Sequence, residues 1–469
     1  MTLNQLFQSL ISYIPATNMN MRKAYQPDEI IPGVQYDIFS NTAKKNVAVF
    51  SIDNQGRLFY FSVEDEVLKR SNFTLKRDEL IDKASHFVKT FYPEIYKDCK
   101  LASFFEIGNT YTVHFAYQDD QLHLFLPETG VTLFLTKSGE ISAVISFHDK
   151  NANIHYPDVM ISAEAAKKQY LHHIEPELLI APMDTYYIKD DGKFRLVYSI
   201  IERAIYIPAG EEKAYVQKDA IKQIPLHKPK KVKTNLHDII GLKDYKLMKK
   251  KQTKKKRIEV WSALPNVIQK KTDFDMDEID SCLMKLCFDK QNRLLQITSE
   301  ETPPKVMSKS IGVEQAEEIA YRLLFHLYPK AHNQLIRIDD EVEMEDVYCF
   351  DFRWQYNNVR ISHDIISIDV GKYSGRICSF NHQPLSKQRY EHVNTTPKLS
   401  KQTVKQIYAD YVQMELRWFQ DEESDYKLVY APTFPKLAGV IRMIDAHTAQ
   451  IFQTLICQIK RDNMLLSKS

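Results

Sequence analysis

The hydrophobic and polar positions of this chain follow one pattern twice, at a separation of 236 residues. Residues 52–58 read IDNQGRL and residues 288–294 read FDKQNRL, and at the same offset Tyr92-Pro93 falls on Tyr328-Pro329. Self-similarity at a fixed separation is the mark of a repeated structural unit. The sequence therefore predicts two copies of one fold in tandem.

Each copy contains an amphipathic helix that stops before the Tyr-Pro pair. The apolar residues are Leu80, Ala84, Phe87, Val88 and Phe91 in the first copy, and Ala316, Ala320, Leu323, Leu324 and Leu327 in the second. Their spacing of i, i+4, i+7, i+8 and i+11 places them on one stripe of a helix.

Strands with a period of two follow each helix. Residues 111–117 (YTVHFAY) and 348–354 (YCFDFRW) alternate between an aromatic face and a more polar one, which is typical of antiparallel strands covered on one side. We expect hairpin turns at the polar breaks 118–120 and 356–358, and further turns at Ser138-Gly139 and Ser374-Gly375.

A second helix is predicted in each copy, over 161–174 and 399–412, with Ser162 and Ser400 as N-caps. Both copies close on a similar strand, FRLVY and YKLVY. The expected fold is α+β, a tandem duplication with helices packed on antiparallel sheets. We expect an N-terminal segment over 1–24, repeat one over 25–227 and repeat two over 228–469.

Composition fits a soluble globular chain whose charge is unevenly placed. Of 469 residues 44% are apolar, and net charge is only +2, yet residues 217–261 hold fifteen Lys and Arg against four acids. The six cysteines form no CxxC pair, and neither a signal peptide nor an apolar run of membrane-spanning length is evident. A cytoplasmic protein with reduced thiols is the expectation.

No catalytic motif is found. The chain has twelve glycines and contains no GxGxxG, GxxxxGK[ST], GxSxG or HExxH pattern, so we assign no catalytic residue, metal or cofactor and favour a non-enzymatic role. The stretch Leu126-Pro127-Glu128-Thr129-Gly130 matches a sorting signal in letters, but its mid-chain position favours a turn.

Two histidines, His114 and His123, would share a sheet face if the hairpin turn lies at 119–120, as a metal or base site requires. The aligned positions of the second copy are Asp351 and Arg360, an opposite-charge pair. A polar cross-strand pair is therefore the simpler interpretation of both.

The sharpest chemical feature is a basic run in which seven of nine residues are cationic, namely Lys249, Lys250, Lys251, Lys254, Lys255, Lys256 and Arg257. Such a cluster can bind nucleic acid or an anionic surface. Its flanks read as the two strands of a hairpin, and no aromatic residues interleave it as base stacking would require. A solvated hairpin tip is the favoured interpretation.

These elements in this order resemble the YcdB/YcdC repeated-domain family, whose units look like PepSY modules. The resemblance rests on the Tyr-Pro helix ends, the Ser-Gly turns and residues 443–449 (MIDAHTA), which are similar to the close of a PepSY unit although Ala449 replaces the usual Gly. It implies a cystatin-like fold with peptide-binding or peptidase-inhibiting function and no catalytic residue. Asp445 and Thr448 could hold a peptide or an ion, but a turn held by their side chains is favoured.

Three functions are open at this stage. The first is a non-enzymatic peptide- or protein-binding module that uses exposed strand faces and edges, with a peptidase as one candidate partner. The second is an accessory protein that binds nucleic acid or an anionic membrane through residues 249–257. The third is a hydrolase with a site between the repeats, which would require His, Asp or Cys clusters from both copies.

Overall fold

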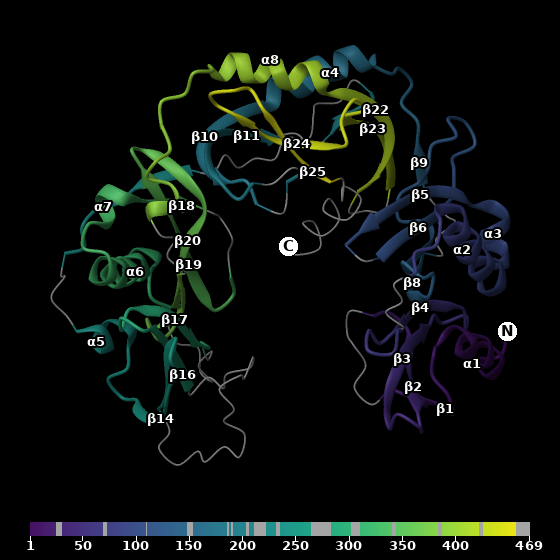
Figure 1. Ribbon diagram of the computed structural model, residues 1–469, viewed down its shortest axis with the longest axis horizontal. Coiled ribbons are helices and arrows are strands. Elements are labelled where there is room, and N and C mark those ends of the chain that lie inside the picture. The colour runs from purple at the N-terminus through teal and green to yellow at the C-terminus, as the bar shows by residue number, and fades with distance from the viewer. Residues whose placement is uncertain are drawn as a thin grey trace.

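The structure is a computed structural model in which two arms hang from a central head, so that the molecule forms an arch (Figure 1). It describes residues 1–24, 31–68, 73–108, 110–147, 153–184, 187–188, 191–202, 206–210, 222–230, 235–263, 283–301, 310–339, 344–382, 387–421 and 425–455. We call residues 1–147 the first arm, residues 222–382 the second arm, and residues 153–210 with 387–455 the head.

The first arm is an eight-stranded antiparallel sheet with helices on one face. Its strand order is β1 (Met19–Lys23), β2 (Val34–Ser40), β3 (Lys45–Ile52), β4 (Leu58–Val63), β8 (Ile141–Phe147), β7 (Gly130–Thr136), β6 (Thr110–Ala116) and β5 (Lys100–Ile107). The helical elements are α1 (Leu3–Leu10), a 3-10 turn at Ile11–Tyr13, α2 (Arg77–Phe91) and α3 (Pro93–Asp98).

The second arm repeats this strand order. Its strands run β14 (Lys246–Gln252), β15 (Lys256–Ser262), β16 (Leu283–Asp289), β17 (Leu294–Ser299), β21 (Ile377–Asn381), β20 (Val359–Gly371), β19 (Val347–Tyr356) and β18 (Leu335–Asp339), with β13 (Lys222–Pro225) added beside β18. The helices are α5 (Leu236–Ile240), α6 (Val313–Leu327) and α7 (Ala331–Gln334). The predicted duplication and the α+β class are therefore confirmed.

The matched motifs adopt the same local geometry in both arms. Asp53 accepts hydrogen bonds from the backbone N of Gln55 and Arg57 at 2.9 Å, and Asp289 accepts them from Gln291 and Arg293 at 2.9 and 2.8 Å. The left-handed position in this turn is Gly56, at φ +75°, in one copy and Asn292, at φ +65°, in the other. Both residue types tolerate that conformation, so the turn survives the substitution.

The predicted helices are present with their predicted faces buried. Leu80, Ala84, Phe87 and Val88 of α2 pack into the core of the first arm, and their counterparts in α6 pack into the core of the second. Tyr92 and Tyr328 are the C-caps. In both arms the described helices lie on the outer side of the arch, so the sheet faces on which the structure describes no helix are turned toward each other (Figure 1). We call these the helix-free faces.

The head is built from both repeats. Repeat one contributes β9 (Asn153–His155), α4 (Ala163–His173), β10 (Ile174–Pro182), β11 (Phe194–Glu202) and β12 (Ile207–Pro208); repeat two contributes a 3-10 turn (Lys387–Arg389), α8 (Lys401–Tyr411), β22 (Gln413–Gln420), β23 (Asp425–Thr433), β24 (Gly439–Asp445) and β25 (Ile451–Leu455). Ser162 and Ser400 cap α4 and α8 as predicted.

One core joins these contributions. Strand β11 pairs with β24, β12 pairs with β23, and the hydroxyls of Tyr170 in α4 and Tyr408 in α8 are 3.0 Å apart inside the core. The expected boundary between the repeats near residue 228 stays a prediction. The two repeats on either side of it both contribute to the head.

Each arm is fastened to the head by polar contacts, and the second arm also by strand pairing. In the second arm, β20 runs parallel to β10, and Arg360 donates two hydrogen bonds to the Glu177 carboxylate at 3.0 and 2.6 Å. For the first arm, β9 runs parallel to β23 next to the joint, and the buried Asp119 carboxylate accepts a hydrogen bond from Trp418 Nε1 of β22 at 2.9 Å.

Candidate binding surfaces

The basic run forms the expected hairpin. Strands β14 and β15 pair in antiparallel fashion around a turn at Thr253, whose Oγ1 accepts hydrogen bonds from the backbone N of Lys255 and Lys256 at 3.3 and 3.0 Å. All seven residues of β14 are exposed, and β14 lies at the outer end of the second arm's sheet. An exposed edge strand of this kind offers its backbone to a further strand unless its side chains prevent pairing.

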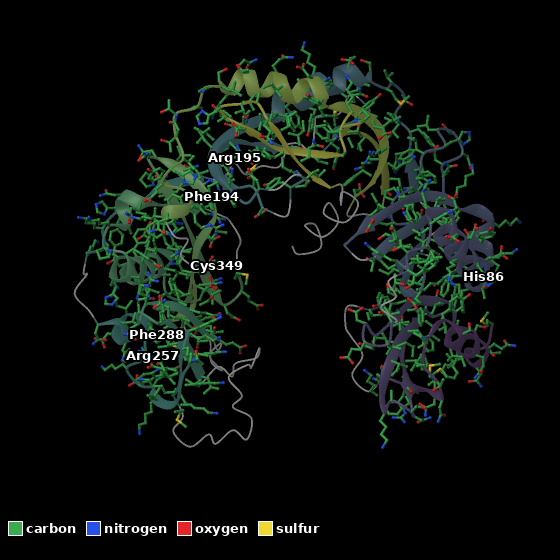
Figure 2. The ribbon with its side chains drawn as sticks, in the orientation of Figure 1. His86, Phe194, Arg195, Arg257, Phe288 and Cys349 are labelled. Atoms are coloured by element: carbon green, nitrogen blue, oxygen red, sulfur yellow. The ribbon has the colours of Figure 1, made fainter. Side chains whose placement is uncertain are left out.

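Arg257 differs from the lysines of the run because it is held against the sheet. Its guanidinium lies 4.1 Å from the ring centre of Phe288 (Figure 2). It also pairs with the buried Glu259 at 3.1 Å and donates a hydrogen bond to Asn292. Lys250 also reaches Glu259, at 3.6 Å. Arg257 therefore contributes to the packing of the hairpin, whereas the flanking lysines are exposed.

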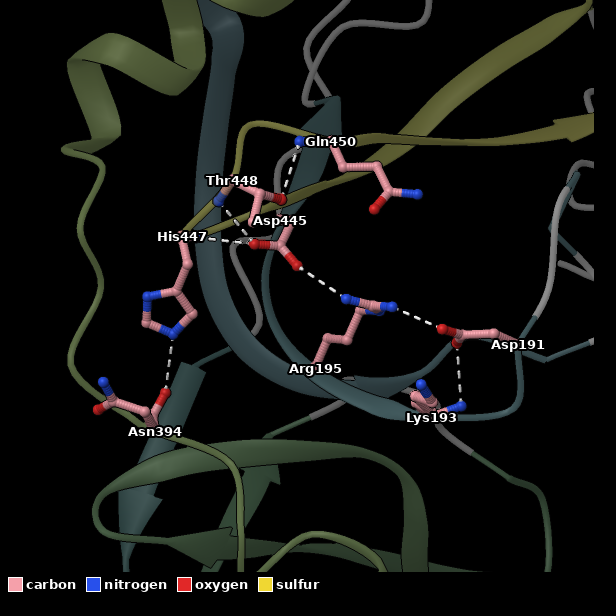
Figure 3. Close-up of polar contacts among 8 residues, drawn as sticks. All are labelled: Asp191, Lys193, Arg195, Asn394, Asp445, His447, Thr448 and Gln450. Carbon is pink, nitrogen blue, oxygen red and sulfur yellow. Dashed lines mark hydrogen bonds and ion pairs between the residues drawn. The ribbon is translucent and has the colours of Figure 1, made fainter.

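Asp445 and Thr448 lie in the turn between β24 and β25. The buried Asp445 carboxylate accepts hydrogen bonds from the backbone N of His447 at 2.8 Å and of Thr448 at 2.9 Å, and Thr448 Oγ1 accepts one from Gln450 N at 3.3 Å (Figure 3). Ala449 takes the left-handed conformation, with φ +64°. These bonds are those of a turn stabilised by Asp and Thr side chains. A binding role for the pair stays a prediction.

Sequence reasoning missed the residue that completes this turn. Arg195 of β11, in the other repeat, lies 3.6 Å from the Asp445 carboxylate and 2.5 Å from that of Asp191 (Figure 3). Its guanidinium also approaches the ring of Phe452 at 5.8 Å. The pairing of β11 with β24, which sets Val197 opposite Asp445, brings Arg195 close to Asp445, whereas Asp191 is four residues from Arg195 in the chain.

The predicted pairing of His114 with His123 is wrong. Residues 117–129 form a loop rather than a tight hairpin turn, so His114 in β6 lies opposite Thr132 of β7, while His123 is in the loop with φ +55°. His114 bonds to the carbonyl oxygen of Thr129 at 2.9 Å, and its burial lowers its pKa. The loop departs from a hairpin because Asp119 turns inward to meet the head.

The corresponding pair in the second copy is also wrong. Asp351 lies opposite Ser367, whose hydroxyl donates to it at 2.5 Å, and Arg360 is directed to Glu177 of the head.

The sequence at 126–130 does form a turn, as expected: buried Thr129 donates to the Leu126 carbonyl oxygen at 2.8 Å, and Gly130 has φ +78°.

No group of three or more His, Cys, Asp or Glu side chains is arranged to hold a metal among the residues that the structure describes. Cys378 is buried, and burial together with nearby Glu301 raises the pKa of its thiol to about 12. Such a thiol is a poor nucleophile at neutral pH.

The helix-free face of the second arm carries a cluster of polar side chains. Cys349, exposed on β19, lies opposite Asp369 of β20, which in turn lies opposite Ser379 of β21. Burial raises the pKa of Asp369, and the negative charge of Asp351 adds to this rise. Cys349 lies on the side of the arm turned toward the first arm, whereas His86 of α2 lies on the outer side of the first arm (Figure 2).

Within the described part of the chain, no helix is long and apolar enough to cross a membrane. Fold and surfaces together define a duplicated α+β protein with helix-free sheet faces on two arms. The chain belongs to the family of the YcdB, YcdC repeated domain, whose model matches residues 9–148 and 230–384. The two matches fall on the two arms and leave out the head, and they confirm the family resemblance read from the sequence.

Two relatives from Bacillus subtilis (strain 168) match along most of their length. The chain is 25% identical to YcdB over 414 residues, which cover 83% of this chain and 85% of YcdB, and 22% identical to YcdC over 437 residues, which cover 86% and 88%. Among solved structures, the Bacillus megaterium YpeB C-terminal domain is similar at 15% identity with a TM-score of 0.29, over 47% of this chain and 99% of that one.

Proposed function

We propose that this protein is a non-enzymatic peptide- or protein-binding module. The observation that carries the proposal is that, among the residues that the structure describes, both arms leave one face of their antiparallel sheet free of helices, on the inner side of the arch (Figure 1). A sheet face with alternating side chains, together with the exposed edge strand β14, provides the surfaces on which extended peptides dock. The narrower form, regulation of a peptidase through PepSY-like units, is part of the proposal.

The test presents a random peptide library, and separately a panel of purified proteases, to the full-length protein. We expect saturable binding of extended peptides or dose-dependent inhibition of a protease. A library that yields no saturable binder, together with proteases whose rates are unchanged, would overturn the proposal.

A second candidate function is binding of nucleic acid or an anionic membrane through residues 249–257. It is supported by the exposure of β14 and of the turn that follows. Affinity for a DNA duplex should then fall by about a thousandfold between roughly 50 and 200 mM salt. A weak salt dependence, or full binding after neutralisation of the lysines, would remove this candidate.

The third candidate, a hydrolase with a site between the repeats, gains no support from the head, where the repeats meet. In the head, the two repeats meet through a hydrophobic core that includes Tyr170, Tyr408 and Trp418. Burial and the neighbouring Glu202 hold the pKa of the Tyr170 and Tyr408 hydroxyls well above their usual value, so neither is a base at neutral pH.

A further inference from the structure

Two rows of side chains cross the helix-free face of the second arm. Residues directly opposite one another on neighbouring strands share a face, so the strand pairing alone defines each row. From β14 through β15, β16, β17, β21 and β20 to β19, the first row is Lys249, Val260, Lys285, Thr298, Ser379, Asp369 and Cys349, and the second is Lys251, Ile258, Cys287, Gln296, Asn381, Ser367 and Asp351.

The two ends of these rows carry opposite charge. Lys249, Lys251 and Lys285 lie at the β14 end, Asp351 and Asp369 lie at the β19 end, and uncharged residues separate them. The alternate residues of β16, Met284, Leu286 and Phe288, belong to the core beneath the helices, which confirms that Lys285 is on the opposite face. Lys249, Lys251, Gln296, Asn381 and Cys349 are exposed.

The first arm has the same strand order but a different surface. The positions that match Lys285, Thr298, Ser379, Asp369 and Cys349 are Val49, Ser62, Ala143, Phe134 and Thr112, and none is charged. Scaffold geometry therefore does not require charge at these positions. At the β1 end of the same row the first arm carries Arg22 opposite Asp37, so its two charges of opposite sign lie side by side. The separation of lysines at one end from aspartates at the other is specific to the second arm.

We propose that the helix-free face of the second arm binds an extended peptide segment that is acidic at one end and basic at the other. Its acidic end would lie on Lys249, Lys251 and Lys285, and its basic end on Asp351 and Asp369. This inference rests on the proposed function and names the class of peptide bound. From β14 to β20 the face spans about 24 Å, five interstrand spacings, so the two charged ends should be about seven extended residues apart.

Charge complementarity favours this partner over a polyanion. A polyanion would be attracted to the lysine end but repelled by Asp351 and Asp369, because like charges brought together across an interface are unfavourable. The positions of the hairpin lysines distinguish a peptide bound on this face from a polyanion bound to the whole basic run. Lys250 lies opposite Glu259, on the helix side of the sheet, and Lys254 and Lys255 lie at the turn, so these three are off the face.

The experiment measures binding of a fluorescent peptide to the full-length protein by anisotropy. The peptide has two glutamates at one end, two lysines at the other and about seven Thr and Val residues between them, which matches the span of the face. A peptide of the same composition with its charges intermixed is the ligand control. We expect the intermixed peptide to bind about tenfold more weakly, since its charges cannot meet both ends.

Two sets of substitutions test the two ends of the face. Lys249→Gln with Lys251→Gln and Lys285→Gln, and separately Asp351→Asn with Asp369→Asn, should each weaken binding by about tenfold or more. The matched control, Lys250→Gln with Lys254→Gln and Lys255→Gln, removes the same charge off the face and should bind as the parent does. Circular dichroism checks that each variant is folded.

Three outcomes would overturn the inference. The control triple could weaken binding as much as the face triple, which would indicate general attraction to the basic run and favour a polyanion. The two peptides could bind equally. Alternatively, the library of the proposed function could yield binders that neither set of face substitutions affects, in which case the peptide-binding function stands and this site does not.

Discussion

At the scale of single residues, the Asp119 side chain joins the first arm to the head. Its carboxylate is 2% exposed and accepts hydrogen bonds from the backbone N of Leu122 and Leu124, from Tyr156 Oη and from Trp418 Nε1. Burial would raise its pKa, but these hydrogen bonds outweigh burial and lower the pKa to about 2. The hydrogen bonds of the folded protein therefore stabilise the ionised form of Asp119.

Asp119→Asn should destabilise the joint between the first arm and the head. The amide keeps one acceptor but brings two donors against groups that already donate, so we expect a loss of about 2–4 kcal/mol in the free energy of unfolding. Urea denaturation followed by tryptophan fluorescence measures it. Asp120→Asn, at the exposed neighbouring position, is the control; equal midpoints for the two variants would contradict the assignment.

The same carboxylate predicts a direction for the dependence of stability on pH. Because its folded pKa of about 2 lies below the unfolded value, Asp119 contributes stability above about pH 4, and that contribution is lost as the pH falls toward 2. The difference in stability between the parent and Asp119→Asn should therefore shrink across this interval. A difference that stays constant from pH 6 to about 2.5 would show that ionisation is not involved.

At the scale of elements, helices α4 and α8 are joined through a buried polar contact. Tyr408 Oη lies 3.0 Å from Tyr170 Oη and donates to Glu202 Oε1 at 3.0 Å, which links both helices to β11. A buried chain of this kind is stabilising only while every member has its partner. Helices α4 and α8 therefore stabilise one another, although each was predicted from its own repeat alone.

Tyr408→Phe should weaken this contact without creating a cavity. Removing the hydroxyl leaves Glu202 and Tyr170 with one partner fewer in the core, so we expect a loss of about 1–3 kcal/mol. The matched control is Tyr411→Phe on the half-buried side of the same helix. Thermal unfolding monitored by circular dichroism measures both, and a Tyr408 variant as stable as the Tyr411 variant would argue against a bonded network.

At the scale of the whole molecule, the two repeats depend on each other for the head. Its core takes Tyr170, Leu196 and Tyr198 from repeat one and Tyr408, Tyr426 and Ile444 from repeat two. Each arm, by contrast, has a core of its own, formed by residues close to it in the chain. Folding of the arms and folding of the head are therefore separable in principle.

Expressing residues 1–227 and 228–469 as separate chains tests this organisation. Neither chain can complete the head, so we expect each to expose apolar surface and bind the dye ANS, and an equimolar mixture to form a one-to-one complex with reduced dye binding. Size-exclusion chromatography with light scattering measures the association. Two chains that stay separate and bind no dye would show that each repeat forms its own head.

The sequence by itself determined the local elements and their duplication. The apolar stripe of α2 and α6, the Tyr-Pro helix ends and the Ser-Gly turns depend on residues close in the chain, so their spacing is sufficient to predict them. The hairpin of the basic run and the turn at Asp445 were predicted for the same reason. N-caps and left-handed turn positions are likewise set by one or two residues.

Only the tertiary structure decided how the repeats combine. Arg195 with Asp445, Asp119 with Trp418, and Tyr170 with Tyr408 each join residues from different repeats, the last two 299 and 238 residues apart. Both repeats carry the same helix-and-strand pattern, so a strand of one copy could pair within its own repeat or with a strand of the other. The alternation of apolar and polar residues is the same in either case and therefore does not distinguish them. The opposite charges of the second arm's face depend in the same way on strand register, which places Lys249 and Asp369 in one row only after all the intervening strands have paired.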